Sequence, residues 1–370
     1  MHTTLFTLDS TNYIGMDLHS NNVFVCIIRN AADSQGRLTK KVVARFKVSL
    51  DFELRDFEQR ISPYCANQPH LATVESTYNW YHLADFFEQK GWNLKLADPT
   101  TVANNKLKNS DDVTDAEYLA DQLRIGQLRA YDIVPKEARN YRDLVRQRVD
   151  VIQARAEHRT KLKNFFNNHC YTAFKTSQLT ALSKQAVKGN LDDLYALLDD
   201  HHAVLKAARW LRTLHFFDSE VERVEEEIKR EQLCERLECF RYLPLLRSMK
   251  GCGFVLSSII ATEIIDIRRF RTDKDFVSYC RLSPSYRLSN GKEKGEGNRK
   301  NGNAYLSWSM TELANLMVQH NPAIKSKYDK LFKKSKLRAK AIRAISAKLA
   351  RCIWHMLQNN EEFDIDRAFN

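Results

Sequence analysis

Acidic residues end two short apolar segments and begin a helical segment in the first third of this chain. Asp17 follows the apolar run at residues 13–16, and Glu75 follows the run at residues 71–74, so each is expected to end a strand. Asp112 and Asp115 are three residues apart, a spacing that places both on one face of a helix. The fold must therefore bring two strand ends and one helix together.

Four carboxylates this close would repel one another unless cations neutralised them. Hard oxygen ligands of this kind suit Mg²⁺ or Mn²⁺, and two such ions can activate an attacking oxygen and stabilise a leaving one in phosphodiester cleavage. Asp17, Glu75, Asp112 and Asp115 are thus predicted to form a divalent-metal site that acts on nucleic acid. His19 could touch this site, although a histidine in a surface turn is the commoner case.

The charge balance favours an acidic partner. The chain has 58 lysines and arginines against 46 aspartates and glutamates, which gives a formal net charge of +12 over 370 residues. A polyanion such as DNA is the natural partner of such a surface. Eight cysteines include no CxxC pair and no zinc spacing, so reduced thiols are expected. With no targeting or membrane segment recognised, we expect a cytoplasmic protein that associates with the nucleoid when it acts.

Strand and helix signals alternate through the first 130 residues. Strands are predicted over residues 13–16, 23–28, 41–48, 71–74 and 93–97, and helices over residues 51–61 and 78–90. The turn-like segment between the first two strands makes them a hairpin. This order predicts an α/β layer on a mixed sheet, and with its acids it resembles the RNase H-like fold in its RuvC-type form.

Helical periodicity takes over from about residue 135. Apolar residues recur every three or four positions in two segments, Val145, Val149, Ile152 and Ala156 in the first, and Leu214, Phe217, Val221, Val224 and Ile228 in the second. The two long helices form either a hairpin within the chain or a coiled coil that pairs subunits. Cations on several faces of the first helix are predicted to contact phosphate: Arg139, Arg142, Arg146, Arg148, Arg155, Arg159, Lys161 and Lys163.

A glycine-rich turn opens the C-terminal third. Gly251 and Gly253 lie between two apolar helical segments, as in a helix-hairpin-helix whose turn aims backbone N–H groups at a DNA phosphate. A Gly-x-Gly turn also occurs for packing reasons alone, so both interpretations stay open. Residues 279–310 are the stretch richest in glycine and serine, and their cations favour a phosphate-handling loop. In a basic helical region over residues 325–351, Ile342, Ile345, Leu349 and Ile353 are predicted to line one buried face, and the other face should lie near nucleic acid.

The acids resemble those of the DEDD-type insertion-sequence transposases, the IS110 group with its IS1111 relatives and the Piv-type DNA invertases. That family has an aspartate in an early strand, a glutamate after a later strand, and the pattern Asp-x-x-Asp-Ala in a helix. The matching residues are Asp17, Glu75, Asp112, Asp115 and Ala116. Asp111 also has a helical spacing to Asp115, but the family pattern selects Asp112.

Four C-terminal family motifs occur in order: Lys250-Gly251-Cys252-Gly253, Arg281-Leu282-Ser283-Pro284, Ser289-Asn290-Gly291-Lys292 and Gly297-Asn298-Arg299-Lys300-Asn301-Gly302-Asn303. Lys250 and Arg281 replace the family's proline and glycine, which makes this a divergent member. We expect an α/β RNase H-like domain over residues 1–130, a helical coiled-coil region over residues 131–240, and a mainly α domain with the helix-hairpin-helix over residues 241–370.

The resemblance implies chemistry and partners as well. A C-terminal serine would attack DNA and hold it as a phosphoserine, and position selects Ser289, with Ser285 and Ser283 as runners-up. The cations that could stabilise the charge on phosphorus are Lys292, Arg299 and Lys300. A homo-oligomer, dimer or tetramer, would hold two DNA ends, and a structured non-coding RNA of the element would guide the choice of sites.

Two rivals to a DNA transposase or recombinase remain. In a hydrolytic nuclease resembling a Holliday-junction resolvase, the same acids would activate water and the serine would be incidental. In a non-catalytic scaffold for nucleic acid, the acids would only cap helices or pair with arginines.

Overall fold

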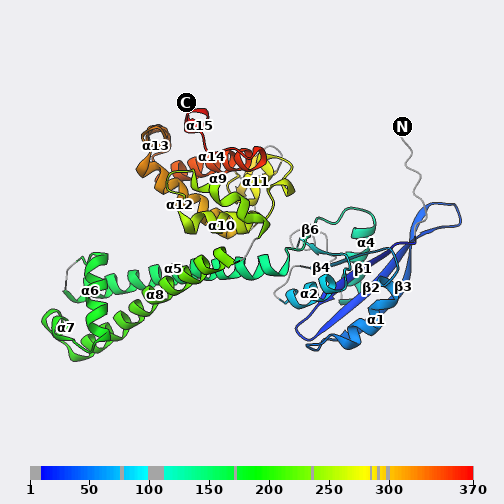
Figure 1. Ribbon diagram of the computed structural model, residues 1–370, viewed down its shortest axis with the longest axis horizontal. Coiled ribbons are helices and arrows are strands. Elements are labelled where there is room, and N and C mark those ends of the chain that lie inside the picture. Colours follow the sequence, from blue (N-terminus) through cyan, green and yellow to red (C-terminus); the bar gives the residue numbers. More distant parts are fainter. Residues whose placement is uncertain are drawn as a thin grey trace. The chain divides into compact units, whose positions relative to one another are not determined.

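The computed structural model divides the chain into two compact units, Met1–Lys136 and Glu137–Asn370. Its elements are drawn in Figure 1. The three-part division expected at residues 130 and 240 stays a prediction. The structure describes residues 10–75, 79–98, 112–170, 173–234, 237–283, 286–289, 292–296 and 301–369.

The described part of the first unit contains a six-stranded mixed sheet in the order β3-β2-β1-β4-β5-β6. Its strands are β1 (Asn12–Leu18), β2 (Asn22–Ala32), β3 (Leu38–Ser49), β4 (His70–Glu75), β5 (Leu94–Ala97) and β6 (Ala130–Asp132). Because β1 is antiparallel to β2 and parallel to β4, the predicted hairpin and mixed sheet are confirmed. Sequence reasoning missed β6, a strand of three residues that is too short to show a periodic signal.

Helices cover both faces of the sheet (Figure 1). α1 (Arg55–Cys65) and α2 (Tyr81–Gln89) pack on one face, against a core that includes Ile14 and Met16 of β1. α4 (Asp112–Arg124) packs on the opposite face. Side chains alternate along a strand, so the odd-numbered residues of β1 face α4 and the even-numbered ones face α1 and α2.

Gly15 sets how closely α4 approaches β1. A Cβ atom at this position would lie 2.0 Å from the carbonyl oxygen of Ala116 and 2.5 Å from the amide nitrogen of Ala120. Both are backbone atoms of α4, so no flexible side chain could move aside. The missing side chain of Gly15 therefore lets the helix backbone rest directly on the strand.

Ion pairs join the outer side of α4 to β3. Lys40 Nζ lies 2.8 Å from Glu117 Oε1 and 3.3 Å from Asp121 Oδ2, and Arg45 also pairs with Glu117. Burial opposes the charged form of Glu117, but Lys40 and Arg45 outweigh it and hold the pKa of Glu117 below its ordinary value of 4.5. The contact of α4 with the sheet thus has an electrostatic part as well as close packing.

Two long antiparallel helices begin the second unit (Figure 1). The helices of this region are α5 (Lys136–Cys170), α6 (Thr176–Val187), α7 (Asp192–Leu197) and α8 (His201–Cys234). Val145 and Val149 of α5 share a core with Val224 and Ile228 of α8. Of the two alternatives left open by the sequence, the structure has the intramolecular one, which we call the helical hairpin (α5 and α8). Pairing of subunits through it stays a prediction.

Several arginines of α5 contact acids instead of pointing freely to all sides. Arg148 lies 2.7 Å from Glu225, and Arg155 and Arg159 each lie 3.0 Å from Asp218. Their acidic partners come from α8, too far away in sequence for a local pattern to reveal, and the expected contact of these arginines with phosphate stays a prediction.

The C-terminal part packs around one large apolar core. Its helices and strands are α9 (Leu243–Arg247), α10 (Phe254–Ile264), α11 (Asp273–Tyr279), β7 (Tyr286–Ser289), β8 (Lys292–Glu296), α12 (Ala304–His320), α13 (Pro322–Ser335), α14 (Arg338–Asn359) and α15 (Ile365–Phe369), with 3₁₀ turns at Glu238–Tyr242 and Ile267–Arg269. The expected loop over residues 279–310 therefore contains an antiparallel strand pair. Ile342, Ile345 and Leu349 of α14 are buried as predicted. Among the described helices, none is both long and apolar enough to cross a bilayer.

Replacing Gly15 by alanine tests the close contact of α4. Since the new Cβ would overlap the backbone of Ala116, we expect the free energy of unfolding of the first unit to fall by about 3 kcal/mol. Urea denaturation of the full chain, with hydrogen exchange of α4 amides, measures both effects. Gly36→Asn is the matched control, because Gly36 has open space around it and asparagine tolerates its positive φ of 74°. Equal stability of the two variants would contradict the contact.

Acidic solution should loosen the same helix. The folded pKa of Glu117 lies below its unfolded value, so its pairing stabilises the fold above pH 4.5 and this stabilisation is lost as pH falls through the folded pKa. Hydrogen exchange of α4 amides between pH 6 and pH 3 should show this loss. In Glu117→Gln, α4 should be less protected at pH 6 and should depend less on pH; an unchanged pH profile would exclude the ion pairs as a source of stability.

Candidate metal centre

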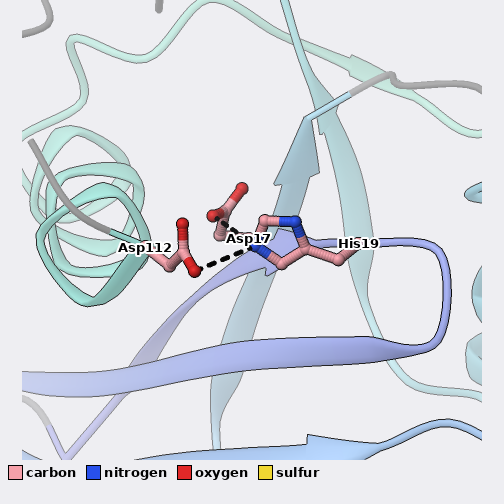
Figure 2. A group of neighbouring side chains, drawn as sticks. All are labelled: Asp17, His19 and Asp112. Carbon is pink, nitrogen blue, oxygen red and sulfur yellow. Dashed lines mark ion pairs between the residues drawn. The ribbon is translucent and has the colours of Figure 1, made fainter.

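Asp17 and Asp112 converge at one end of β1, together with His19 (Figure 2). Asp17 is the sixth of the seven residues of β1, Asp112 is the first residue of α4, and His19 follows β1 in the turn to β2. His19 Nε2 lies 3.3 Å from Asp17 Oδ2 and 3.4 Å from Asp112 Oδ2. One donor atom from each residue lies within 4.8 Å of the other two, and all three residues are half-buried.

The contact at Gly15 explains why these carboxylates meet. Asp17 lies two residues after Gly15 on the same face of β1. Asp112 lies one helical turn before Ala116, whose carbonyl faces Gly15. The same contact that brings the two backbones together therefore brings the two side chains together a few ångströms further along.

The other two predicted acids lie beside this pair. Glu75 ends β4 directly after Val74, which is paired with Met16, so the parallel register places it next to Asp17. Asp115 lies nearly one turn along α4 from Asp112 and is half-buried, as is Glu75. Neither belongs to the compact group of donor atoms found among the described residues. The ligand roles of all four acids stay predictions.

Two carboxylate oxygens from distant parts of the chain form a donor set that fits a hard divalent cation. Asp17 and Asp112 would hold such an ion. His19 is the residue to which sequence reasoning gave too little weight: it does lie in the turn, but its ring also faces the acids. The signal was its position two residues after Asp17, which puts both on one side of an extended chain.

The glycines of the turn between α9 and α10 have different roles. Gly251 has a positive φ of 101°, and a Cβ there would lie 3.1 Å from Leu316 Cβ, so backbone conformation and packing both require it. Gly253 is the N-cap of α10, and a Cβ there would meet nothing within 4 Å. Gly253 therefore has the open surroundings that a phosphate contact needs, whereas Gly251 has the packing role.

Ser289 is the last residue of β7 and is paired in register with Lys292 of β8. The segment that carries it, which we call the serine-bearing segment (residues 281–302), is closed at its base by two hydrogen bonds. Arg281 Nε donates to the carbonyl of Gly302 at 2.9 Å, and the backbone N–H of Asn303 donates to the carbonyl of Tyr279 at 2.6 Å. Of the other predicted site residues, Asp111, Ser285, Arg299 and Lys300 lie outside the described residues.

Glu263 of α10 is a buried carboxylate that sequence reasoning missed. Its side chain is 1% exposed and accepts two hydrogen bonds from Arg146, from Nε at 2.5 Å and from a terminal nitrogen at 2.7 Å. Asn303 Nδ2 donates to it at 2.6 Å. Through Glu263, Arg146 joins α5 to the base of the serine-bearing segment, and its expected contact with phosphate stays a prediction. The missed signal was a single acid in an otherwise apolar helix, which must be paired if it is buried.

Two family patterns match this chain. A DEDD transposase pattern of the IS110 group matches residues 14–171, and the pattern described as "Transposase IS116/IS110/IS902 family" matches residues 243–329. Both describe transposases, and together they span about two thirds of the chain. The first contains Asp17, Glu75, Asp112 and Asp115, and the second contains the glycine turn and Ser289.

Two relatives are similar over part of their length. The candidate transposase y4qE of Sinorhizobium fredii is 23% identical over 205 residues, which is 54% of this chain and 46% of that protein. The uncharacterized 43.6 kDa protein of insertion element IS110 from Streptomyces coelicolor is 23% identical over 177 residues, 47% of this chain and 44% of that protein. The chain thus matches less than half the length of either relative.

With both family patterns in their expected places, the chain belongs to the IS110 family of DEDD transposases.

Removing one carboxylate should weaken cation binding. Asp17→Asn and Asp112→Asn should each raise the dissociation constant for Mn²⁺ at least about tenfold, because an amide carries no charge to attract the ion. Isothermal titration calorimetry of the full chain measures it. Asp56→Asn is the control, since Asp56 is an exposed acid in the first turn of α1 on the opposite face of the sheet. If all three variants bound Mn²⁺ as the wild type does, the ion would bind elsewhere.

Proposed function

We propose that this chain is a DNA transposase that uses a divalent cation at Asp17, Glu75, Asp112 and Asp115 and a serine nucleophile, Ser289. The observation that carries the proposal is the convergence of Asp17 and Asp112, whose oxygens lie 3.3 and 3.4 Å from one imidazole nitrogen, inside the region matched by the DEDD transposase pattern. The first unit is proposed to be RNase H-like, of the RuvC type, because its acids end neighbouring parallel strands of a mixed sheet.

In the proposed reaction the Oγ of Ser289 forms a bond to a DNA phosphorus, and the bond from that phosphorus to one bridging deoxyribose oxygen breaks. The hydroxyl proton passes to a carboxylate of the acidic group, and the leaving oxygen takes up a proton. A hydroxyl of a second DNA end then displaces the serine, which restores the enzyme. The bound cation would supply Lewis-acid stabilisation of the charge on phosphate. The proposal requires Ser289 of the second unit and the acids of the first to act on one phosphate.

The surface of α13 and the start of α14 supports a nucleic-acid partner. Asp329 is the single acidic residue among many exposed cations in this segment. The cations are Lys325, Lys327, Lys330, Lys333, Lys334, Lys336, Arg338, Lys340 and Arg343. Such a surface attracts phosphate and releases counterions on binding. Lys292, Arg299, Lys300 and the backbone at Gly253 are proposed as further phosphate contacts.

A guide RNA and an oligomer are part of the same proposal. This basic surface could bind a structured non-coding RNA as well as DNA. The helical hairpin offers long helices through which a dimer or tetramer could pair its subunits.

A covalent adduct tests the nucleophile. Incubation of the full chain with labelled element-end DNA and Mg²⁺ should give a protein–DNA adduct that survives denaturation. Ser289→Ala should abolish it, since no other hydroxyl would occupy that position, while Ser285→Ala should keep it. A denaturing gel shows the adduct directly.

The rival nuclease gives a different result in the same experiment. DNA cleavage without any trapped adduct, unchanged in Ser289→Ala but lost in Asp17→Asn, would mean that the acids activate water. Loss of the adduct in Ser285→Ala alone would move the nucleophile to that residue.

A further inference from the structure

We infer that His19 is a ligand of the proposed metal centre, and that its imidazole makes the site prefer Mn²⁺ over Mg²⁺. The inference rests on the proposed metal function and adds a nitrogen donor to the four acids. Its basis is the position of one ring atom, Nε2, between the carboxylates of Asp17 and Asp112 (Figure 2).

The distances suit a shared ion better than hydrogen bonds. Nε2 lies 3.3 Å from Asp17 Oδ2 and 3.4 Å from Asp112 Oδ2. A charge-assisted hydrogen bond from imidazolium to carboxylate would be about 2.7–2.9 Å long, and a single N–H could point at only one of the two oxygens. Nε2 is shielded from solvent and makes no hydrogen bond among the described residues. The three donor atoms all lie within 4.8 Å of one another, close enough to bind one cation together.

Local structure holds the ring in this place. The His19 amide donates to the carbonyl of Asn22 at 2.9 Å, and Asn79 Nδ2 donates to the carbonyl of His19 at 2.5 Å. The ring also meets the edge of Phe24, with 6.1 Å between centroids. Asn79 lies just before α2, so the turn to β2 and the segment before α2 both hold the backbone of His19 in place.

The nitrogen donor has a consequence for metal choice. Mg²⁺ is held by oxygen ligands and water, and Mn²⁺ also favours oxygen ligands, but as a first-row transition ion Mn²⁺ accepts an imidazole nitrogen more readily than Mg²⁺ does. A site with two or more carboxylates and one imidazole therefore binds both ions but gains more with Mn²⁺. Mn²⁺ is also paramagnetic, so its electron paramagnetic resonance spectrum reports whether a nitrogen atom is bound directly to the ion.

Pulsed electron paramagnetic resonance on the full chain with Mn²⁺ tests the inference. The wild type should show coupling to a directly bound ¹⁴N nucleus, and growth on ¹⁵N-labelled histidine should convert it to the ¹⁵N pattern. His19→Gln should lose this coupling while Mn²⁺ stays bound. His82→Gln is the control, because His82 is an exposed histidine of α2 that contacts the carbonyl of Phe52. Labelled wild-type protein keeps the test valid even if His19→Gln folds poorly.

Calorimetry supplies the second readout. His19→Gln should raise the Mn²⁺ dissociation constant about tenfold and change that of Mg²⁺ less than about twofold. Bound Mn²⁺ without nitrogen coupling in the wild type, or equal losses for both ions, would overturn the role of His19 and leave the acidic site standing. Failure of the wild type to bind either ion would overturn the proposed metal centre itself, and His19 with it.

Discussion

The close contact between Gly15 and the backbone of α4 is the constraint on which the first unit depends. A strand and a helix normally keep their backbones apart by the width of their side chains, and here one residue has none. The backbone of α4 can therefore pack directly against the sheet, with its first residue, Asp112, beside the end of β1. The convergence of Asp17 and Asp112 follows from this approach, because each is only a few residues from the contact.

In the second unit, a network of polar contacts holds the base of the serine-bearing segment in place. The serine-bearing segment is closed at its base by one side-chain and one backbone hydrogen bond to main-chain carbonyls, and the side chain of Asn303 at its end donates to a buried carboxylate, Glu263. Arg146 completes this network from α5. Burial of a carboxylate costs free energy unless the carboxylate is paired. Glu263 therefore needs both Arg146 and Asn303, and loss of either partner would destabilise the network. The base of the segment is thereby tied to the helical hairpin.

The sequence was informative where the signal is local. Alternating apolar runs located the strands from β1 to β5, and helical periodicity located α5, α8 and the buried face of α14. Sequence reasoning failed where tertiary structure decides. Arg148 and Arg155 find acids on a partner helix, and Glu263 is explained only by an arginine more than 100 residues away. His19 could be placed in its turn, but only the approach of α4 puts Asp112 on the other side of its ring.

Anomalous X-ray scattering from crystals grown with Mn²⁺ tests the central claim most directly, since it locates the ion without reference to activity. The account predicts a strong peak between the side chains of Asp17 and Asp112, within coordination distance of both carboxylates. A bound ion at some other place, with these two carboxylates turned away from each other, would contradict it.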